Sequence, residues 1–495
     1  MKKQGSITVF LTLMLSLLLS LVCTSIESAR MAAARTQILN SMDIGLYSLF
    51  GQYDKKLLED YELFAIDGSY GKRQLDLASV YDNMKSYMVP ILKQNSQNLT
   101  LKQGGFTGYR LMTDDNGEPF FEQIVQYMKN SLGSRGIQLL LDKMSERKAK
   151  TEEADRNADQ AQSGHTIAQY DSEMNNAAQR SRQAEEEAKK KQEQSGNNDF
   201  SSGEQLPAAP VKPVENPITV IKKIMKMGIL ELVLPYGKEI SSAEIDKSDV
   251  VSTRNLQQGM RMPDGFQTDN SYTSEILFQQ YIMDHLGSYI NPARYSLAYQ
   301  AEYIFGGKDN DVDNLKTVAS RLLLIREGVN LACLMSDSVK RAQAQSLALA
   351  IASGFLIPPA SVVIESTLLL CWSFAESVLD VRELFNGGRI PLVKTSETWQ
   401  ISLENLPHLL EGLDYMRKND ESGLSYEDYL QVLILSRSKR DKIMRTMDMV
   451  ESVIRKEGGK TLFRMDSCIV AVEAFMDVKA NKRKVFNVTR QYCYK

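Results

Sequence analysis

A long, mainly hydrophobic run lies close to the N-terminus of the chain. Residues 6–26 contain no charged residue, no Pro and no Gly, and their polar members are only Ser, Thr and Cys. As a helix, this run is about 31 Å long, which is enough to cross the hydrocarbon core of a bilayer. Lys2 and Lys3 precede it. We therefore predict a single-pass protein of the cell membrane, with residues 1–5 in the cytoplasm and the bulk of the chain outside.

Beyond residue 26 the hydrophobic pattern becomes helical. Apolar residues recur at spacings of three and four, which predicts that the membrane helix continues as an amphipathic helix to about Glu59. A strand-like run over 61–66 follows, and residues 27–149 form the first part of the predicted ectodomain. We expect a hairpin around the glycine-containing segment 104–117. The residues of the helical stripe are Ile38, Met42, Leu46, Leu49, Tyr53 and Leu57.

Residues 150–216 interrupt the apolar patterning. Glu and Lys alternate there at i,i+4 spacing, as in Glu185–Lys189, which supports an exposed helix. Residues 194–217 are then rich in Ser, Gly and Asn and contain four prolines. This composition predicts a disordered spacer, stiffened at its end toward polyproline II.

The C-terminal part, residues 217–495, is predicted to form an α+β ectodomain. Residues 340–357 and 361–385 are expected to form a buried helical hairpin rather than a membrane pair, because the apolar part of the first helix is too short to span. Glu365 and Glu376 then mark a solvent-facing side of the second helix. The fold class is therefore mainly α with smaller β elements. The other expected elements are helices over 218–234, 274–290, 314–335, 425–436 and 439–456, a strand over 296–305, and an antiparallel β pair over 462–478 and 485–494.

Three cleavage hypotheses compete with a retained anchor. The Ala32–Ala34 triplet resembles a signal-peptidase site, but it lies beyond Glu27 and Arg30. Cys23 suggests lipid attachment, although Val22 is bulky for such a site. The basic leader ending at Gly5, followed at once by an apolar helix, is typical of type IV pilins. A cut between Gly5 and Ser6 would leave the helix in the membrane.

On this leader, the membrane helix and the helix that continues from it, residues 1–66 resemble the TadE/TadG-like pseudopilins of tight-adherence pilus systems. Tad pilins carry Glu five residues after the cut, where this chain has Phe10. The chain also resembles an uncharacterised family of Gram-positive membrane-anchored proteins associated with Tad-like pilus loci. The segments that carry this second resemblance are 5–10, 26–30, 61–64, 302–308, 322–327 and 390–394.

The resemblance implies that the membrane and other pilin-like or pilus-assembly proteins are the partners. Small and hydroxyl side chains recur every four residues along the membrane helix and form a candidate packing face for a homo- or hetero-oligomer. Ordinary tolerance of Ser in membrane helices explains the same pattern equally well. The residues concerned are Ser16, Ser20, Thr24 and Ser28.

The net charge and the cysteines bear on the possible partners and on disulfide formation. The net charge is only −3 over 495 residues, so no global field favours nucleic acid or anionic lipid as a partner. No Cys-x-x-Cys pair occurs, and we expect Cys333 and Cys371 to be free buried thiols. A Cys468–Cys493 disulfide is a weaker prediction, because both residues fall in the β-rich tail.

Catalytic motifs are missing from the sequence. It contains no P-loop, GxGxxG, HExxH or GxSxG, and the three histidines lie far apart. Asp309, Asp311 and Asp313 resemble the opening of a calcium loop, but the pattern then fails, because no Gly occupies its sixth position. We expect no cofactor.

The sequence therefore favours a non-enzymatic surface protein, a minor pseudopilin or an assembly component of a Tad-like pilus. A membrane-tethered binding or sensing protein is the alternative. An exported enzyme with an unrecognised site is the third hypothesis.

Overall fold

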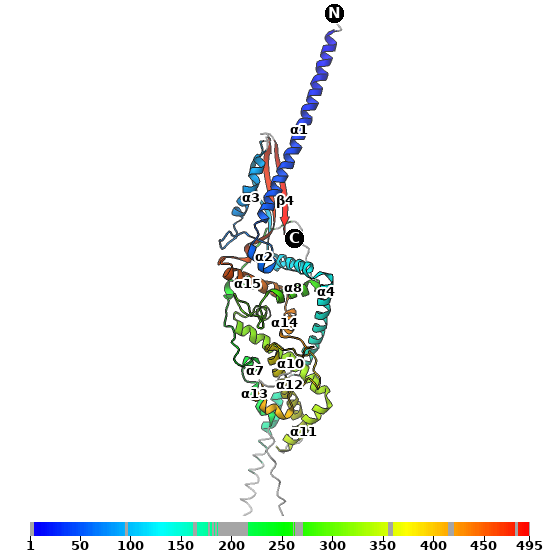
Figure 1. The fold of residues 1–495 in the computed structure, drawn as a ribbon, viewed down its shortest axis with the longest axis vertical. Coiled ribbons are helices and arrows are strands. Elements are labelled where there is room, and N and C mark those ends of the chain that lie inside the picture. The colour runs from blue at the N-terminus through cyan, green and yellow to red at the C-terminus, as the bar shows by residue number, and fades with distance from the viewer. Residues whose placement is uncertain are drawn as a thin grey trace, which may run out of the picture. The chain divides into compact units, whose positions relative to one another are not determined.

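The chain forms two compact units, each assembled from separate segments (Figure 1). Unit 1 contains Met1–Ile137, Asp246–His285 and Ser438–Lys495, and unit 2 contains Gln138–Ile245 and Leu286–Arg437. The computed structural model describes residues 4–94, 98–161, 166–176, 179–180, 183, 186, 216–260, 262, 271–354, 360–413, 420–480 and 484–494. The predicted linker over 194–217 lies outside these residues except for its last two positions.

Unit 1 combines helices with the sheet of the molecule. Helix α4, Asp114–Ala161, begins in unit 1 and continues into unit 2, with a non-helical residue at Gly133. The other elements of unit 1 are α1 (Gln4–Phe50), α2 (Lys55–Tyr61), β1 (Ile66–Asp67), α3 (Leu77–Lys93), β2 (Thr100–Leu111), η1 (Lys247–Asp249), α8 (Tyr272–His285), α15 (Lys439–Glu457), η4 (Met465–Ser467), β3 (Cys468–Ala480) and β4 (Lys484–Cys493).

Strand β3 is the centre of an antiparallel sheet. It pairs with β2 along one edge and with β1 and then β4 along the other, so that Phe475 lies between Gly105 and Thr489. The predicted C-terminal antiparallel pair is confirmed. The predicted hairpin over 104–117 is wrong, because this segment belongs largely to β2 and pairs with the distant β3. Gly104 is required there, since a Cβ atom would collide with the Tyr81 hydroxyl that lies over the strand.

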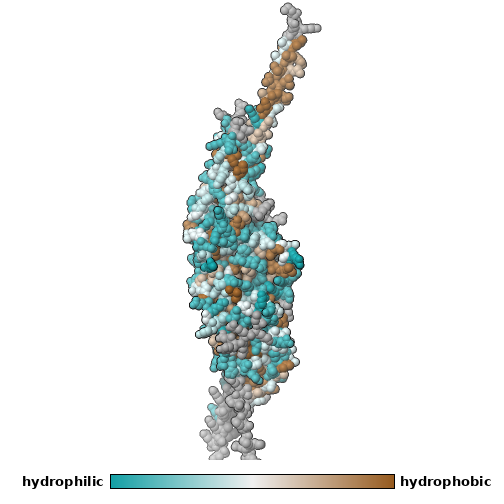
Figure 2. Space-filling view, in the orientation of Figure 1, coloured by the Kyte–Doolittle hydropathy of each residue, from teal (hydrophilic) through white to brown (hydrophobic). Residues whose placement is uncertain are grey.

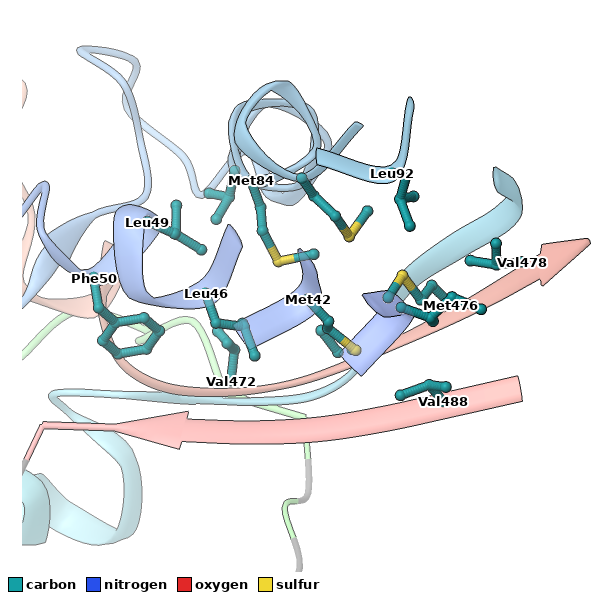
Figure 3. Close-up of a cluster of buried hydrophobic side chains, with 14 of the residues drawn as sticks. Met42, Leu46, Leu49, Phe50, Met84, Leu92, Val472, Met476, Val478 and Val488 are labelled. Carbon is teal, nitrogen blue, oxygen red and sulfur yellow. The ribbon is translucent and has the colours of Figure 1, made fainter. Parts of the chain in front are cut away.

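The second half of α1 packs with α3 on the sheet (Figure 3). Its buried residues recur every three or four positions, as the sequence predicts, and α3 contributes a matching apolar stripe. Gly45 allows the two helices to approach closely, because a Cβ there would lie 3.2 Å from Met88 Cβ. The core includes Ala34, Ile38, Met42, Leu46, Leu49 and Phe50 from α1, Val80, Met84, Met88 and Leu92 from α3, and Val472, Ala474, Met476, Val478 and Val488 from the sheet.

Helix α1 ends earlier than predicted. The chain leaves the helix after Phe50, and Asp54 caps a new helix, α2, by accepting hydrogen bonds from the backbone of Lys56 and Leu57. The predicted strand over 61–66 shrinks to the two residues of β1. Leu57 is nonetheless buried, so the apolar stripe crosses the break.

An arginine cluster fixes the inserted segment 246–260 within unit 1. The Arg254 side chain is only 6% exposed; its Nη2 lies 2.7 Å from Glu451 Oε2, and it also pairs with Asp466. Asp249 pairs with Arg455 and Arg464 in the same region. These ion pairs hold the segment against α15 and the start of β3.

Unit 2 is built around the buried helix α12. Every residue from Thr367 to Phe385 is buried, and α12 contacts α10, α11, α6 and α7. The two helices α11 and α12 pack together as predicted, but the predicted burial holds for α12 alone, because most described residues of α11 are exposed. The helices of unit 2 are α6 (Pro217–Ile224), α7 (Ile229–Val233), α9 (Gln300–Gly306), α10 (Asp311–Ser336), α11 (Ser338–Gly354), α12 (Ser361–Phe385), η3 (Leu403–His408), α13 (Leu409–Gly412) and α14 (Tyr426–Leu435).

Two further predictions have different outcomes. The strand expected over 296–305 is wrong, because most of this segment forms the short helix α9, which ends with Gly307 in the left-handed region. The helix expected after Ser425 is confirmed as α14. Ser425 and Asp428 form its capping box through reciprocal hydrogen bonds.

Part of the predicted spacer is helical. Residues 166–176 form a helix in which Tyr170 is 3% exposed. The Tyr170 hydroxyl accepts a hydrogen bond of 2.9 Å from Asn216 Nδ2. This part of the spacer is therefore packed rather than solvated.

Candidate membrane anchor and its packing surface

The first half of α1 is a free apolar surface. Every residue from Ile7 to Arg30 is exposed, and Leu17 reaches 69% exposure (Figure 2). Thirteen large hydrophobic residues between Ile7 and Ile26 are exposed, and leaving them in water carries a large hydrophobic free-energy cost. Among the described residues, two helices are long and apolar enough to cross a membrane, namely α1 and α12. Helix α12 is mostly buried in the protein, whereas the apolar part of α1 is not. Residues 7–26 thus have the form of a membrane anchor or a signal sequence.

Polar groups in this half of α1 are satisfied within the helix. The Ser16 hydroxyl donates to the Leu13 carbonyl at 2.8 Å, and the Thr24 hydroxyl donates to the Ser20 carbonyl at 3.0 Å. A helix of this kind leaves few unpaired polar groups in lipid. Ser20 and Ser28 are exposed on the same face as Ser16 and Thr24. Packing of another helix against this face stays a prediction.

The candidate processing residues lie at the start of α1. The helix begins at Gln4, so the Gly5–Ser6 peptide bond falls in its first turn. Phe10 follows one turn later and is 64% exposed. Cleavage between Gly5 and Ser6 would leave residues 7–50 of the helix intact.

The C-terminal segment, residues 490–494, contacts the C-terminal end of α1. The Tyr494 hydroxyl donates to the Phe50 carbonyl at 2.6 Å, and the Phe50 ring lies 4.7 Å from that of Tyr492 between centroids. Arg490 also pairs with Asp43 of α1. The C-terminal segment thus packs against the last turns of α1. Sequence reasoning missed this contact, because it depends on a pairing between residues more than 400 positions apart.

The predicted Cys468–Cys493 disulfide is not formed in the structure. Neither cysteine is in a disulfide, and Cys493 pairs with Ala471 in the sheet. Cys468 is therefore three residues away along β3, about 10 Å by strand rise, which exceeds the Cα separation that a disulfide allows. Burial also raises the pKa of the Cys468 thiol well above its usual range.

The three aspartates of the calcium-like motif have separate structural roles. Asp311 is fully buried, and its carboxylate accepts hydrogen bonds from the Ser241 hydroxyl and the backbone of Ala298 and Tyr299. Asp313 lies in the first turn of α10 beside its cap, and the Asp309 carbonyl pairs with the backbone of segment 241–245. Within the described part of the chain, no group of three His, Cys, Asp or Glu side chains is arranged to hold a metal ion.

Four charged side chains meet in the interior of unit 2. Arg326 Nη2 lies 2.9 Å from Asp380 Oδ2, and Lys394 Nζ lies 2.6 Å from Asp380 Oδ1. Lys394 also pairs with Glu376, and none of the four side chains is more than 1% exposed. The prediction that Glu376 lies on a solvent-facing side of the helix is wrong, because this side chain is fully buried and pairs with Lys394.

Burial and pairing act in opposite directions on the two acids of this cluster. Burial alone would raise the pKa of Asp380, but Lys394 and Arg326 outweigh it and hold this pKa below its ordinary value. For Glu376, burial prevails over Lys394 and raises the pKa. All four side chains are buried, and their ion pairs join α10, α12 and the segment around Lys394.

A separate buried acid in unit 2 has an incomplete hydrogen-bond set. Glu302 Oε1 accepts from the Tyr289 backbone at 2.8 Å and from the Tyr426 hydroxyl at 2.7 Å, whereas Oε2 has no partner among the described residues. Burial raises the pKa of Glu302 from 4.5 to about 7. Glu302 thus keeps its proton in the folded state well above the pH at which an unfolded chain releases it.

This property makes the stability of unit 2 depend on pH. Between pH 4.5 and 7 the unfolded chain loses the Glu302 proton while the folded chain keeps it, so the free energy of unfolding falls by about 3 kcal/mol as pH rises. Glu302→Gln is expected to abolish this part of the pH dependence. Denaturant unfolding at pH 5 and 8, with the exposed Glu404→Gln as control, measures it. Equal pH dependence in wild type and Glu302→Gln would contradict the assignment.

The sequence was also compared with known families. It matches a family of unknown function, DUF5702, over residues 209–480, which is more than half of the chain. The chain belongs to this family. No curated protein and no solved structure matches it. The DUF5702 region includes Glu302, the buried charge cluster and strand β3, but it begins after α1. The family match therefore carries no information about the pilin resemblance of residues 1–66.

Proposed function

We propose that this DUF5702 protein is a non-enzymatic, single-pass membrane protein that serves as a minor pseudopilin or assembly component of a Tad-like pilus. Its N-terminus is cytoplasmic in this proposal, residues 7–26 span the membrane, and the rest of both units lies on the extracytoplasmic side. The observation that carries the proposal is the continuous helix α1, whose first half is exposed and apolar and whose second half packs on an antiparallel sheet.

The two halves of α1 suit a subunit that moves from a membrane into an assembly. The packed half holds the helix rigidly against unit 1, so that the exposed half projects without support from its own chain. An exposed apolar helix is stable in lipid or against other apolar helices. The membrane would hold the subunit until other pilin-like helices replace the lipid around residues 7–26.

Processing at the leader gives the first test. We expect that co-expression with a prepilin-type peptidase yields a mature chain that begins at Ser6, as measured by N-terminal sequencing. Phe10→Glu places the acid that Tad pilins carry at this position and is expected to increase the cleaved fraction. A Gly5→Leu variant is the control that should remain uncut.

An intact Met1 in wild type and in Phe10→Glu, both with active peptidase, would overturn the pilin-like processing. The protein would then be better described as a membrane-tethered binding or sensing protein. The same sequencing run detects a third outcome. A start after Ala34 would identify residues 1–34 as a removed signal.

A further inference from the structure

Basic side chains gather at the end of unit 1 from which the exposed half of α1 projects. They come from all the long elements of this end, namely α1, α3 and the three long strands. In Figure 1 the tip of the sheet and the end of α3 lie alongside α1 where the free half of the helix begins. We call these residues the basic collar: Arg30, Arg35, Lys93, Lys102, Lys479 and Lys484.

Contacts between α1, α3 and the sheet show which turn of α1 lies beside the basic collar. Gln37 of α1 donates a hydrogen bond to the Ile91 carbonyl at 3.1 Å, which places the end of α3 beside this turn of the helix. Ala34, Leu92 and Ala480 share one core cluster. In the sheet, Lys479 pairs with Thr100, and Ala480 pairs with Lys484. The collar lysines therefore lie on α3 and on the sheet, beside α1, at about the level of Ala34.

That level is close to the expected membrane surface. Ala34 follows Ile26 by eight residues, or about 12 Å of helix, and the headgroup layer occupies about 5–8 Å of that distance. The lysines thus stand within about one Debye length, 8 Å at physiological salt, of lipid phosphates.

The charge of the collar is not balanced by its own surroundings. Within the part of the chain that the structure describes, none of the six cations forms an ion pair, and all but the half-buried Lys479 are exposed. Glu27 and Asp477 are the nearby acids, and the Asp477 carboxylate already accepts hydrogen bonds from Gln103 and Asn487. The whole chain has a net charge of −3, so this concentration of positive charge is a local feature.

We infer that the basic collar binds the anionic headgroups of the membrane that holds α1. The exposed side chain of Val485 lies beside Lys484 in β4 and can enter the interface between headgroups and acyl chains. Lysines next to an anchor gain attraction from each anionic lipid they meet, and their long stems let the ammonium groups reach the phosphates. The collar thereby holds unit 1 upright on the membrane. This inference rests on the proposed role of α1 as an anchor.

Lysine acetylation of the full chain in lipid nanodiscs tests the inference. One set of discs contains only phosphatidylcholine, and the other contains phosphatidylglycerol as a third of its lipid. We expect Lys93, Lys102 and Lys484 to react about fivefold more slowly in the anionic discs and to recover in high salt. The exposed Lys55 and Lys316, read by mass spectrometry in the same samples, should react equally in both.

Two contrary outcomes separate the hypotheses. Equal rates in both disc types, with the protein incorporated, would overturn lipid binding and leave the collar as a surface for an acidic protein. Failure to incorporate into either disc would instead overturn the anchor itself.

A charge-matched pair of variants gives an independent readout. Lys93→Gln/Lys102→Gln/Lys484→Gln is expected to lose the roughly twofold enrichment of phosphatidylglycerol in lipid that co-purifies with the wild type. Lys55→Gln/Lys143→Gln/Lys316→Gln, which changes exposed lysines elsewhere, should retain it. Loss in both variants, or in neither, would contradict the inference.

Discussion

Replacement of Asp380 by Asn is expected to lower the free energy of unfolding of unit 2 by about 3–5 kcal/mol. The substitution leaves Arg326 and Lys394 in a fully buried site with Glu376 as the remaining charged partner. An unbalanced buried cation has lost its hydration and most of its compensating attraction. Hydrogen exchange of the α12 amides in the full chain measures the effect.

The control for this prediction is Glu365→Gln on the same helix. Glu365 lies 4.0 Å from Arg341, whose side chain is half exposed, so the loss should stay within about 1 kcal/mol. Arg326→Met in the Asp380→Asn background restores the charge balance and should recover part of the stability. If Asp380→Asn costs no more than Glu365→Gln, the buried cluster does not have the role assigned to it.

Leu46→Asp is expected to have a comparable effect in unit 1. Leu46 is 1% exposed and lies between α3 and the sheet, so the substitution removes apolar packing and buries a carboxyl group without a partner. The expected loss is about 4 kcal/mol or more. Amide exchange in α3 and β3 should therefore accelerate strongly, whereas insertion of residues 7–26 into membranes should be unchanged.

The neighbouring residue provides the matched control. Tyr47 is 70% exposed in the same turn of the helix, and Tyr47→Asp should change stability by no more than about 0.5 kcal/mol. Similar losses for Leu46→Asp and Tyr47→Asp would mean that α1 does not pack on the sheet through the face described here.

The sequence predicted α1 well because its signals are local. An uncharged run of sufficient length and an apolar stripe at helical spacing both appear within a few turns, and Ile38, Met42 and Leu46 are all buried as expected. The end of the helix was misplaced because the stripe continues through Leu57 across the break. Gly51 and the capping residue Asp54 were the signals that mark it.

The features that the sequence could not predict depend on distant partners. A glutamate in an apolar helix, such as Glu376, suggests a solvent-exposed side of that helix. In the structure Glu376 pairs instead with Lys394, which lies on an irregular segment. The pairing of β2 with β3 joins residues about 370 positions apart, and Arg254 finds both of its acids in other segments. Hydrophobic periodicity contains no information about such pairings.

Hydrogen exchange of the full chain in nanodiscs tests most directly whether one helix is both membrane anchor and core element. The account predicts slow exchange over residues 7–26, protected by lipid, and over residues 34–50, protected by packing, in the same molecule. In Leu46→Asp the second region should lose protection while the first retains it. Rapid exchange over residues 7–26 in the wild type, or a mature chain without them, would contradict the account.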